Sequence, residues 1–295
     1  MFYISSIVFG LALGAMCIGL FVSLKIFNFP DITTDGSYTL GASITAVGIV
    51  LGWPLPVVFL CSLVAGGISG VMTGLLHTKL KMNNLLSGIL VMTGLYSVNL
   101  AILGRSNVPL SSDHKTIADY FTWTTSPVWN EFIALAIIII LLAYLLFWLL
   151  KTDFGLAMRA TGSQPSMAIM NGISVNKYTV LGLALANGLV AVSGFLVVQL
   201  QGFADINMGI GIVIIGLGSV MIGETFSTLF GTKSILIRLM WVILGSIAFR
   251  MILSLALTLG IDPVWLKLIT AIMVIALVGL PVVASPIRKS LKQRK

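Results

Sequence analysis

Long apolar segments are the feature that most constrains this chain. A helix needs about 20 apolar residues to cross the hydrocarbon core of a bilayer. Hydrophobic residues make up 58% of the sequence and charged residues only 9%, against about 45–50% and about 25% in a soluble domain. So little polar surface excludes an ordinary soluble protein. The sequence therefore predicts an all-α, polytopic transmembrane bundle that forms a single domain over residues 1–295.

About nine spans are predicted. They lie near residues 4–24, 36–52, 55–76, 85–104, 131–150, 178–200, 209–222, 234–258 and 264–284. The second and the seventh are short and rich in glycine, which predicts tilted, half-length or re-entrant pieces. Non-helical backbone at membrane depth survives only where protein or a cavity covers it. In the third span, Gly66, Gly70 and Gly74 recur at every fourth residue. This smooth strip predicts close helix packing, with a subunit interface as one candidate.

The distribution of Lys and Arg predicts the orientation, because cytoplasmic loops are enriched in both. If nine crossings alternate, most basic residues fall on one side of the membrane, which places the N-terminus outside and the C-terminus inside. The basic residues on the inner side are Lys25, Lys79, Lys81, Lys151, Arg159, Lys177, Lys233, Arg238, Arg288, Lys289, Lys292, Arg294 and Lys295. The net charge of +8 is thus assigned to cytoplasmic loops and the basic tail 285–295, and not to nucleic-acid binding.

The outer loop 105–130 contains several aromatic residues. Trp and Tyr are typical of the membrane–water interface, and docking of an extracytoplasmic partner is the alternative role. The aromatic residues are Tyr120, Phe121, Trp123 and Trp129.

Signals for enzymatic chemistry or for a bound cofactor are weak. Cys17 and Cys61 both sit inside apolar runs, and His77 and His114 fall on opposite sides of the predicted membrane. These residues predict neither a disulfide framework nor a shared metal site. The segment 231–234 lacks the Gly-Lys step of a phosphate-binding loop. We therefore expect no catalytic residue and no cofactor on this chain.

The inner loop 151–177 contains the pattern of a short helix. Ser163 is a candidate N-cap, Pro165 suits the first turn, and Gly172 suits the left-handed stop that follows. Met167 and Ile169 lie between them. Flexible apolar side chains on a short helix are typical of helix-in-groove contacts, although a helix lying on the bilayer surface fits the residues equally well.

Three segments resemble ABC importer permeases of the branched-chain amino-acid and ribose type. The strongest is the inner loop, with Gly155, Arg159-Ala160-Thr161-Gly162, Pro165 and Gly172-Ile173-Ser174-Val175-Asn176-Lys177-Tyr178. The second segment runs from Phe29 to Ala42 and includes Asp31, Thr33, Asp35, Gly36 and Ser37. The third runs from Asp205 to Gly211 and is followed by Gly223-Glu224.

The resemblance implies a bacterial inner-membrane permease that works as a dimer, with a homodimer expected. A cytoplasmic ATPase dimer would bind ATP and Mg²⁺, and an extracytoplasmic binding protein would deliver the solute. The segment that couples to the ATPase would comprise Arg159, Gly162, Ser163, Pro165, Met167, Ile169, Met170, Gly172 and Ile173. The second and third segments look closest to a branch that takes aromatic or other amino acids. A sugar or nucleoside permease is the alternative, and an ion-gradient-driven transporter is another.

Several polar residues are candidates for the pathway or a gate. Arg250 lies inside an apolar span, which is costly and is commonly functional. Pairing with Asp205 or Asp262 would be a structural role for it, and contact with a substrate carboxylate would be a functional one. Asp31, Thr33, Asp35 and Ser37 open the second span, where a helix-cap cluster is the alternative to a gate. Asn84 and Asn187 either bond between helices or line a polar path.

Overall fold

The computed structural model describes residues 2–110, 116–120, 126–232 and 234–277. The chain is almost entirely helical. The helices are α1 (Phe2–Phe21), α2 (Thr33–Val50), α3 (Leu55–Leu80), α4 (Asn84–Leu103), α5 (Ile117–Tyr120), α6 (Pro127–Lys151), α7 (Asp153–Ser163), α8 (Pro165–Met170), α9 (Val175–Gln201), α10 (Ile212–Leu229) and α11 (Ile235–Thr258). A π-helical turn η1 (Val22–Ile26) extends α1, a 3₁₀ turn η2 (Pro263–Trp265) follows α11, and an apolar helix runs from Leu266 to Leu277.

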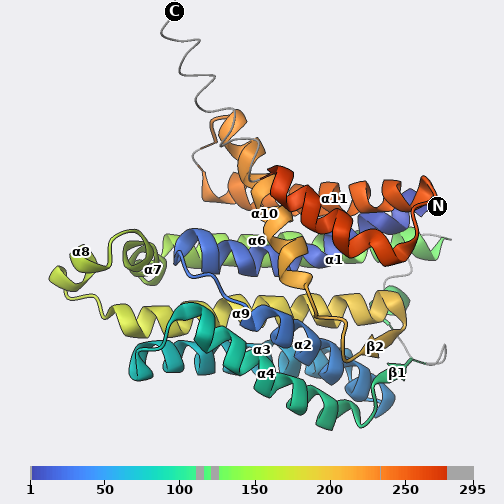
Figure 1. Cartoon of the computed structure of the whole chain (residues 1–295), viewed down its shortest axis with the longest axis horizontal. Coiled ribbons are helices and arrows are strands. Elements are labelled where there is room, and N and C mark those ends of the chain that lie inside the picture. Colours follow the sequence, from blue (N-terminus) through green and yellow to red (C-terminus); the bar gives the residue numbers. More distant parts are fainter. Residues whose placement is uncertain (1, 111–115, 121–125, 233, 278–295) are drawn as a thin grey trace, which may run out of the picture.

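Two helices, α1 and α9, form the centre of the bundle and pack against each other. On one side of this pair, α1 contacts α6, α10 and α11. On the other side, α9 contacts α2 and α3, and α4 covers these two (Figure 1). The short helices α7 and α8 lie at one end of the bundle, whereas α1 starts at the opposite end (Figure 1).

The predicted number of nine spans is not confirmed. In the described part of the chain, seven helices are long and apolar enough to cross a membrane. Helix α2 has 18 residues, but it is not among the seven because Thr, Ser and Asp side chains lower its hydropathy. The helix that begins at Leu266 is described only as far as Leu277.

Two helices extend past the approximate predicted spans at positions where charged side chains interrupt the apolar window. Helix α10 runs to Leu229 and not to residue 222, since Glu224 is paired with Arg238 and does not end the helix. Helix α2 begins at Thr33 and not at Gly36, since Asp35 and its neighbours are buried. Each helix has 18 residues and is therefore about 27 Å long at 1.5 Å per residue.

The inner loop contains two helices where one was predicted. Helix α7 begins after Thr152, whose hydroxyl accepts the backbone N–H of Gly155 at 3.4 Å. Ser163 ends α7 and donates its hydroxyl to the Ala160 carbonyl at 3.3 Å. The prediction that Ser163 caps the second helix was therefore wrong; Gln164 occupies that position without a side-chain cap.

A small two-stranded sheet, which was not predicted, lies at the end of the bundle opposite α7 and α8 (Figure 1). Strand β1 (Asn107–Pro109) pairs antiparallel with β2 (Phe203–Asp205), so that Val108 faces Ala204. The sheet ties the 105–130 loop to the end of α9. Within that loop Tyr120 and Trp129 are exposed, while Phe121 and Trp123 lie outside the described residues. The basic tail 285–295 and Lys233 also lie outside them.

Candidate functional site

Helix α8 exposes an apolar tip. Met167, Ile169 and Met170 point away from the protein, and Met170 is 83% exposed. Ala168 is buried and anchors the helix. Gly172 adopts a φ of 76°, as predicted, and the next residue, Ile173, donates its N–H back to the Ala168 carbonyl at 2.9 Å. The left-handed stop thus folds the chain back and leaves three apolar side chains uncovered.

Helix α7, in contrast, is packed tightly against the bundle. A Cβ atom at Gly155 would overlap the backbone of Leu150, and one at Gly162 would overlap the carbonyl of Ile26 in η1. Both glycines are therefore required by close backbone contact. Pro165 follows directly and starts α8 at its first position, where its missing N–H leaves no bond unmade. The tip of α8 is consequently connected to α1 through a rigid α7.

An ion-pair group that the sequence did not predict lies at the same end. Glu224 of α10 accepts two bonds of 2.9 Å from Arg238 of α11, and Lys25 of η1 lies 3.8 Å from the same carboxylate. The Arg238 guanidinium also lies over the ring of Phe21 at 5.3 Å. The signal in the sequence was the Gly223-Glu224 pair, but nothing in it indicated which cations would meet Glu224.

A buried polar cluster joins four of the pathway candidates. The amide of Asn187 donates to Asp31 at 2.6 Å, and its oxygen accepts the Ser37 hydroxyl at 2.7 Å. Asp31 also accepts the N–H of Thr33, the first residue of α2, at 2.8 Å. We define the buried polar cluster by its members, which are Asp31, Thr33, Ser37, Ser69, Thr73 and Asn187. All six are buried, with Asn187 at 0% exposure, so in this conformation they bond helices α2, α3 and α9 to one another.

Asp35 joins two helices that are far apart in sequence. Its two carboxylate oxygens accept the backbone N–H groups of Gly211 and Val213, each at 2.9 Å. Asp35 therefore caps the start of α10 and not its own helix. The positive end of the α10 dipole favours a carboxylate at this place.

Arg250 and Asn84 stand apart from the cluster. The Arg250 guanidinium lies over the ring of Phe9 at 4.8 Å. Within the described ranges no carboxylate lies at ion-pair distance from Arg250, so the predicted pairing with Asp205 or Asp262 is absent there. Asn84 is the first residue of α4 and is half-buried.

The glycine strip of α3 meets α9 of the same chain. Added Cβ atoms would overlap α9 at Ala191 for Gly66, at Leu183 for Gly70 and at Val180 for Gly74. The strip is therefore already covered within one copy, and it leaves no surface for a second one.

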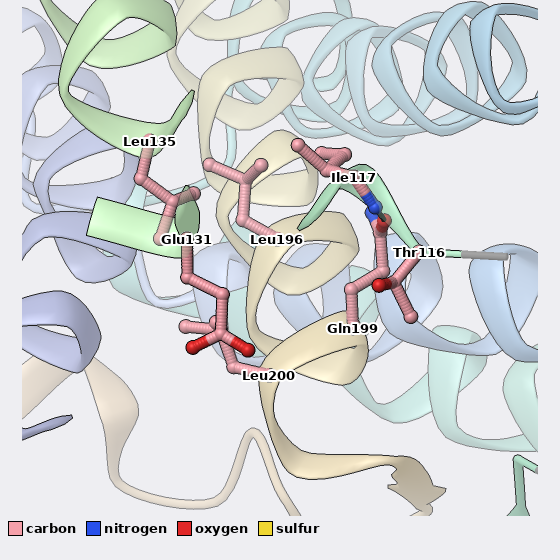
Figure 2. A pocket seen from close by; sticks show the side chains of 7 residues that line it. All are labelled: Thr116, Ile117, Glu131, Leu135, Leu196, Gln199 and Leu200. Carbon is pink, nitrogen blue, oxygen red and sulfur yellow. Dashed lines mark hydrogen bonds between the residues drawn. The ribbon is translucent and has the colours of Figure 1, made fainter. Parts of the chain in front are cut away.

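A small hollow lies between α5, α6 and α9 (Figure 2). It holds about 20 Å³ and is lined by Glu131 and Gln199, among others. Gln199 accepts the backbone N–H of Ile117 at 3.0 Å. A volume of this size accommodates about one water molecule, so this hollow is too small for an amino acid or a sugar. The sequence interpretation missed Glu131, although it opens the fifth predicted span.

Metal-binding chemistry has no basis in the geometry. No group of three or more His, Cys, Asp or Glu side chains is close enough to hold a metal ion among residues 2–110, 116–120, 126–232 and 234–277. The arrangement thus offers bonds between helices, an apolar tip and an ion-pair group, which suit mechanical and binding roles.

Comparison with known proteins gives the family. Residues 2–278 match the family described as branched-chain amino acid transport system / permease component. The tyrosine transport system permease protein of Clostridioides difficile is 41% identical over 266 residues, which cover 90% of this chain and 86% of that protein. The protein RP368 of Rickettsia prowazekii is 34% identical over 261 residues and covers 87% and 89% of the two chains.

A more distant relative comes from sugar transport. The galactofuranose transporter permease protein YtfT of Escherichia coli is 27% identical over 217 residues, which cover 70% of this chain and 61% of that protein. The family match, in contrast, extends over nearly all of the described residues and includes α2, α7, α8 and α10. This chain therefore belongs to the family of branched-chain amino acid transport permeases, the membrane components of ABC importers.

Proposed function

We propose that this chain forms the solute pathway of an ATP-driven importer and is moved by a separate ATPase through helix α8. The observation that carries the proposal is the tip of α8, where Met167, Ile169 and Met170 are exposed next to a rigidly packed α7. A helix that presents apolar side chains fits a groove on a partner. The rigid α7 transmits a displacement of α8 to η1 and α1. In this proposal the end with α7 and α8 faces the cytoplasm, and ATP and Mg²⁺ are bound by the partner.

Co-purification tests the coupling step. Gentle detergent extraction of the complete transporter should yield an ATPase subunit together with this chain. The double change Met167→Asp and Ile169→Asp should release that subunit, because charged side chains cannot enter an apolar groove without losing their hydration. Leu80→Asp is the matched control, since Leu80 is also 65% exposed and ends α3 between two lysines. Retention of the ATPase with full transport in the double variant would contradict the assignment.

We further propose that two copies pair and enclose the pathway between them. The side chains of the buried polar cluster are bonded to each other, so in this conformation they are not free to bind a solute. A recess of about 720 Å³ lies against α2, α3 and α4 and is lined by Ile68, Met72 and Leu90, among others. Helices α3 and α4 also leave most of their apolar surface uncovered. We therefore propose that the face formed by α3 and α4 is the contact between the two copies.

Disulfide cross-linking tests the pairing. In a Cys61→Ser background, Met72→Cys should give a covalent dimer in membranes, because the two copies of this residue would lie near the symmetry axis. Tyr144→Cys on α6 is the control and should give little dimer, although it is equally exposed. A covalent dimer with Tyr144→Cys but not with Met72→Cys would show that the copies meet at α6 and would contradict the proposed contact.

We infer an amino acid as the substrate, either aromatic or branched. The support is that the similar permease of Clostridioides difficile is named a tyrosine transport protein and that the family is named for branched-chain amino acids. A sugar remains the second candidate, because the galactofuranose permease is also similar. Uptake of labelled tyrosine, leucine and ribose by cells with and without this chain separates the two. Loss of ribose uptake alone would favour the sugar and reject the amino acid.

A further inference from the structure

A cavity lined by basic side chains lies at the end of the bundle that contains α7 and α8. It measures about 320 Å³ and opens between η1, α7 and α11. Its lining consists of Phe21, Lys25, Ile26, Arg159, Gly162, Ser163, Ile235 and Arg238. The volume is at the lower end of the range of small-molecule sites, about 300–1,000 Å³. The cavity can therefore hold one small polar group.

The charges around the cavity do not balance. Arg238 and Lys25 share a single carboxylate, Glu224, and Lys25 is the more distant of the two at 3.8 Å. Arg159 has no carboxylate within ion-pair distance in the described part of the chain, and its Nε is buried without a hydrogen-bond partner. Buried polar groups are normally bonded. The cavity thus has a surplus of positive charge, and one of its lining residues, Arg159, has no carboxylate partner among the described residues.

Two of the elements that line the cavity, η1 and α7, are in close backbone contact. Lys25 lies in the π-helical turn η1, which is confirmed by the bond from the Phe27 N–H to the Val22 carbonyl at 3.1 Å. Single π-turns occur frequently at functional sites. Gly162 of α7 packs directly on Ile26 of the same turn. The backbone segments that carry Lys25 and Arg159 are therefore held against each other, and a site whose backbone is already in place lowers the entropic cost of binding.

We propose that this cavity binds a phosphate group, supplied by the headgroup of an anionic phospholipid or by a free phosphate ion. Arginine and lysine together are the usual partners of phosphate oxygens, because the guanidinium offers several N–H donors and the ammonium a compact charge. The cavity lies where η1 ends and α11 begins, which in our proposal is the level at which lipid headgroups meet the protein. Basic pockets between transmembrane helices bind anionic headgroups in this way.

Titration of the purified full-length protein in neutral detergent tests the proposal. Three probes are added in separate arms: short-chain phosphatidylglycerol, short-chain phosphatidylcholine and inorganic phosphate. The unfolding midpoint is followed by tryptophan fluorescence, since a ligand that binds the folded state raises it. We expect phosphatidylglycerol or inorganic phosphate to raise the midpoint, and phosphatidylcholine to have little effect. Saturation with phosphatidylglycerol alone identifies a lipid site, and saturation with inorganic phosphate as well identifies a site for the free ion.

Three variants make the result specific. Arg159→Gln should weaken binding of the effective probe at least tenfold, and Lys25→Gln, at a partly exposed residue that tolerates change, should weaken it in the same direction. Arg105→Gln removes a charge from an exposed position outside the cavity and should leave the affinity unchanged. The absence of saturable binding, or equal losses in Arg105→Gln and Arg159→Gln, would overturn the proposal. So would unchanged affinity in Arg159→Gln combined with release of the ATPase, since the charges would then serve an acidic side chain of that partner.

Discussion

The buried polar cluster and the tip of α8 are opposite in composition and in environment. In the cluster, Asp31 and Asn187 are polar and are shielded from solvent. In α8, Ile169 and Met170 are apolar and are the exposed part of the helix. Each region therefore reverses the simple rule that polar side chains are exposed and apolar ones are buried.

The difference lies in where each region finds its partners. The cluster is satisfied within the chain, because three helices supply donors and acceptors to one another. The tip of α8 has no such cover from the described residues, and we propose that a surface of the ATPase covers it. The first arrangement stabilises the fold, and the second is available for a contact that forms and breaks. The four variants below test this division, from the largest expected effect to the smallest.

Asn187→Leu should have the largest effect. The leucine leaves a carboxylate oxygen of Asp31 and the Ser37 hydroxyl without this partner. An unsatisfied buried group costs about 1–3 kcal/mol, and more if it is charged, so we expect a loss of about 3 kcal/mol in the free energy of unfolding. Denaturant titration in detergent measures it. Asn84→Leu, outside the cluster, is the control, and equal losses in both variants would show that the cluster is not special.

Gly162→Val should have the next largest effect. A side chain at this position overlaps the Ile26 carbonyl, and overpacking of this kind costs about 1–3 kcal/mol. Because α7 supports α8, the variant should also lose ATPase binding. Thermal unfolding and co-purification are the two measurements. Gly94→Val is the matched control, because it places the same side chain in a helix at a position where an added Cβ meets no other atom. If Gly162→Val binds the ATPase normally, α7 is not the support that we infer.

Gly172→Ala should cost less and act locally. The φ of 76° at this residue is unfavourable for alanine by about 1–2 kcal/mol. We expect the end of α8 to fray, which hydrogen exchange of the amides of Gly172 and Ile173 would detect as faster exchange. Protection in α9 should not change. Loss of protection throughout the bundle would mean that α8 is part of the folding core, contrary to the comparison.

Met170→Ser should have the smallest effect on stability. The side chain is almost fully exposed, and surface changes of this kind stay within about 0.5 kcal/mol. Its effect should appear only in the affinity for the ATPase, measured by titration of the purified partner. A clear fall in the unfolding midpoint of the isolated chain would show that α8 packs on its own protein.

The sequence predicted the membrane helices well where hydropathy is uninterrupted. The predicted helix ends were displaced at Glu224 in α10 and Asp35 in α2. Each of these carboxylates accepts hydrogen bonds from another helix, and a hydropathy window contains no information about such a partner. Helix α7 was missed because the segment 151–177 was interpreted as a loop with one short helix, and Gly155 and Gly162 were used only as part of a family pattern. Both residues are glycine for a different reason, which is contact with backbone that is distant in sequence.

The candidate site was predictable to a similar extent. The stop at Gly172 and the apolar residues of α8 are local features, and both were found. Four of the six members of the polar cluster were also recognised one by one, whereas Ser69 and Thr73 were not. Asp31 and Asn187 are 156 positions apart, and no local pattern shows that they meet. The predicted partners of Arg250 failed for the same reason, since the fold places the guanidinium over Phe9.

The carboxylate of Asp35 adds a free-energy cost to any movement that separates α2 from the start of α10. Two backbone N–H groups of one helix end on a single side chain of the other. Each bond to a charged acceptor contributes about 1.5–3 kcal/mol, so separating the helices at this point requires about 3–6 kcal/mol. At 1.4 kcal/mol per factor of ten, the joined form outweighs the separated one by about two to four orders of magnitude. The two helices would therefore be joined at this point nearly all of the time, and a bias of about 3–6 kcal/mol would be needed to make the separated form as common as the joined one.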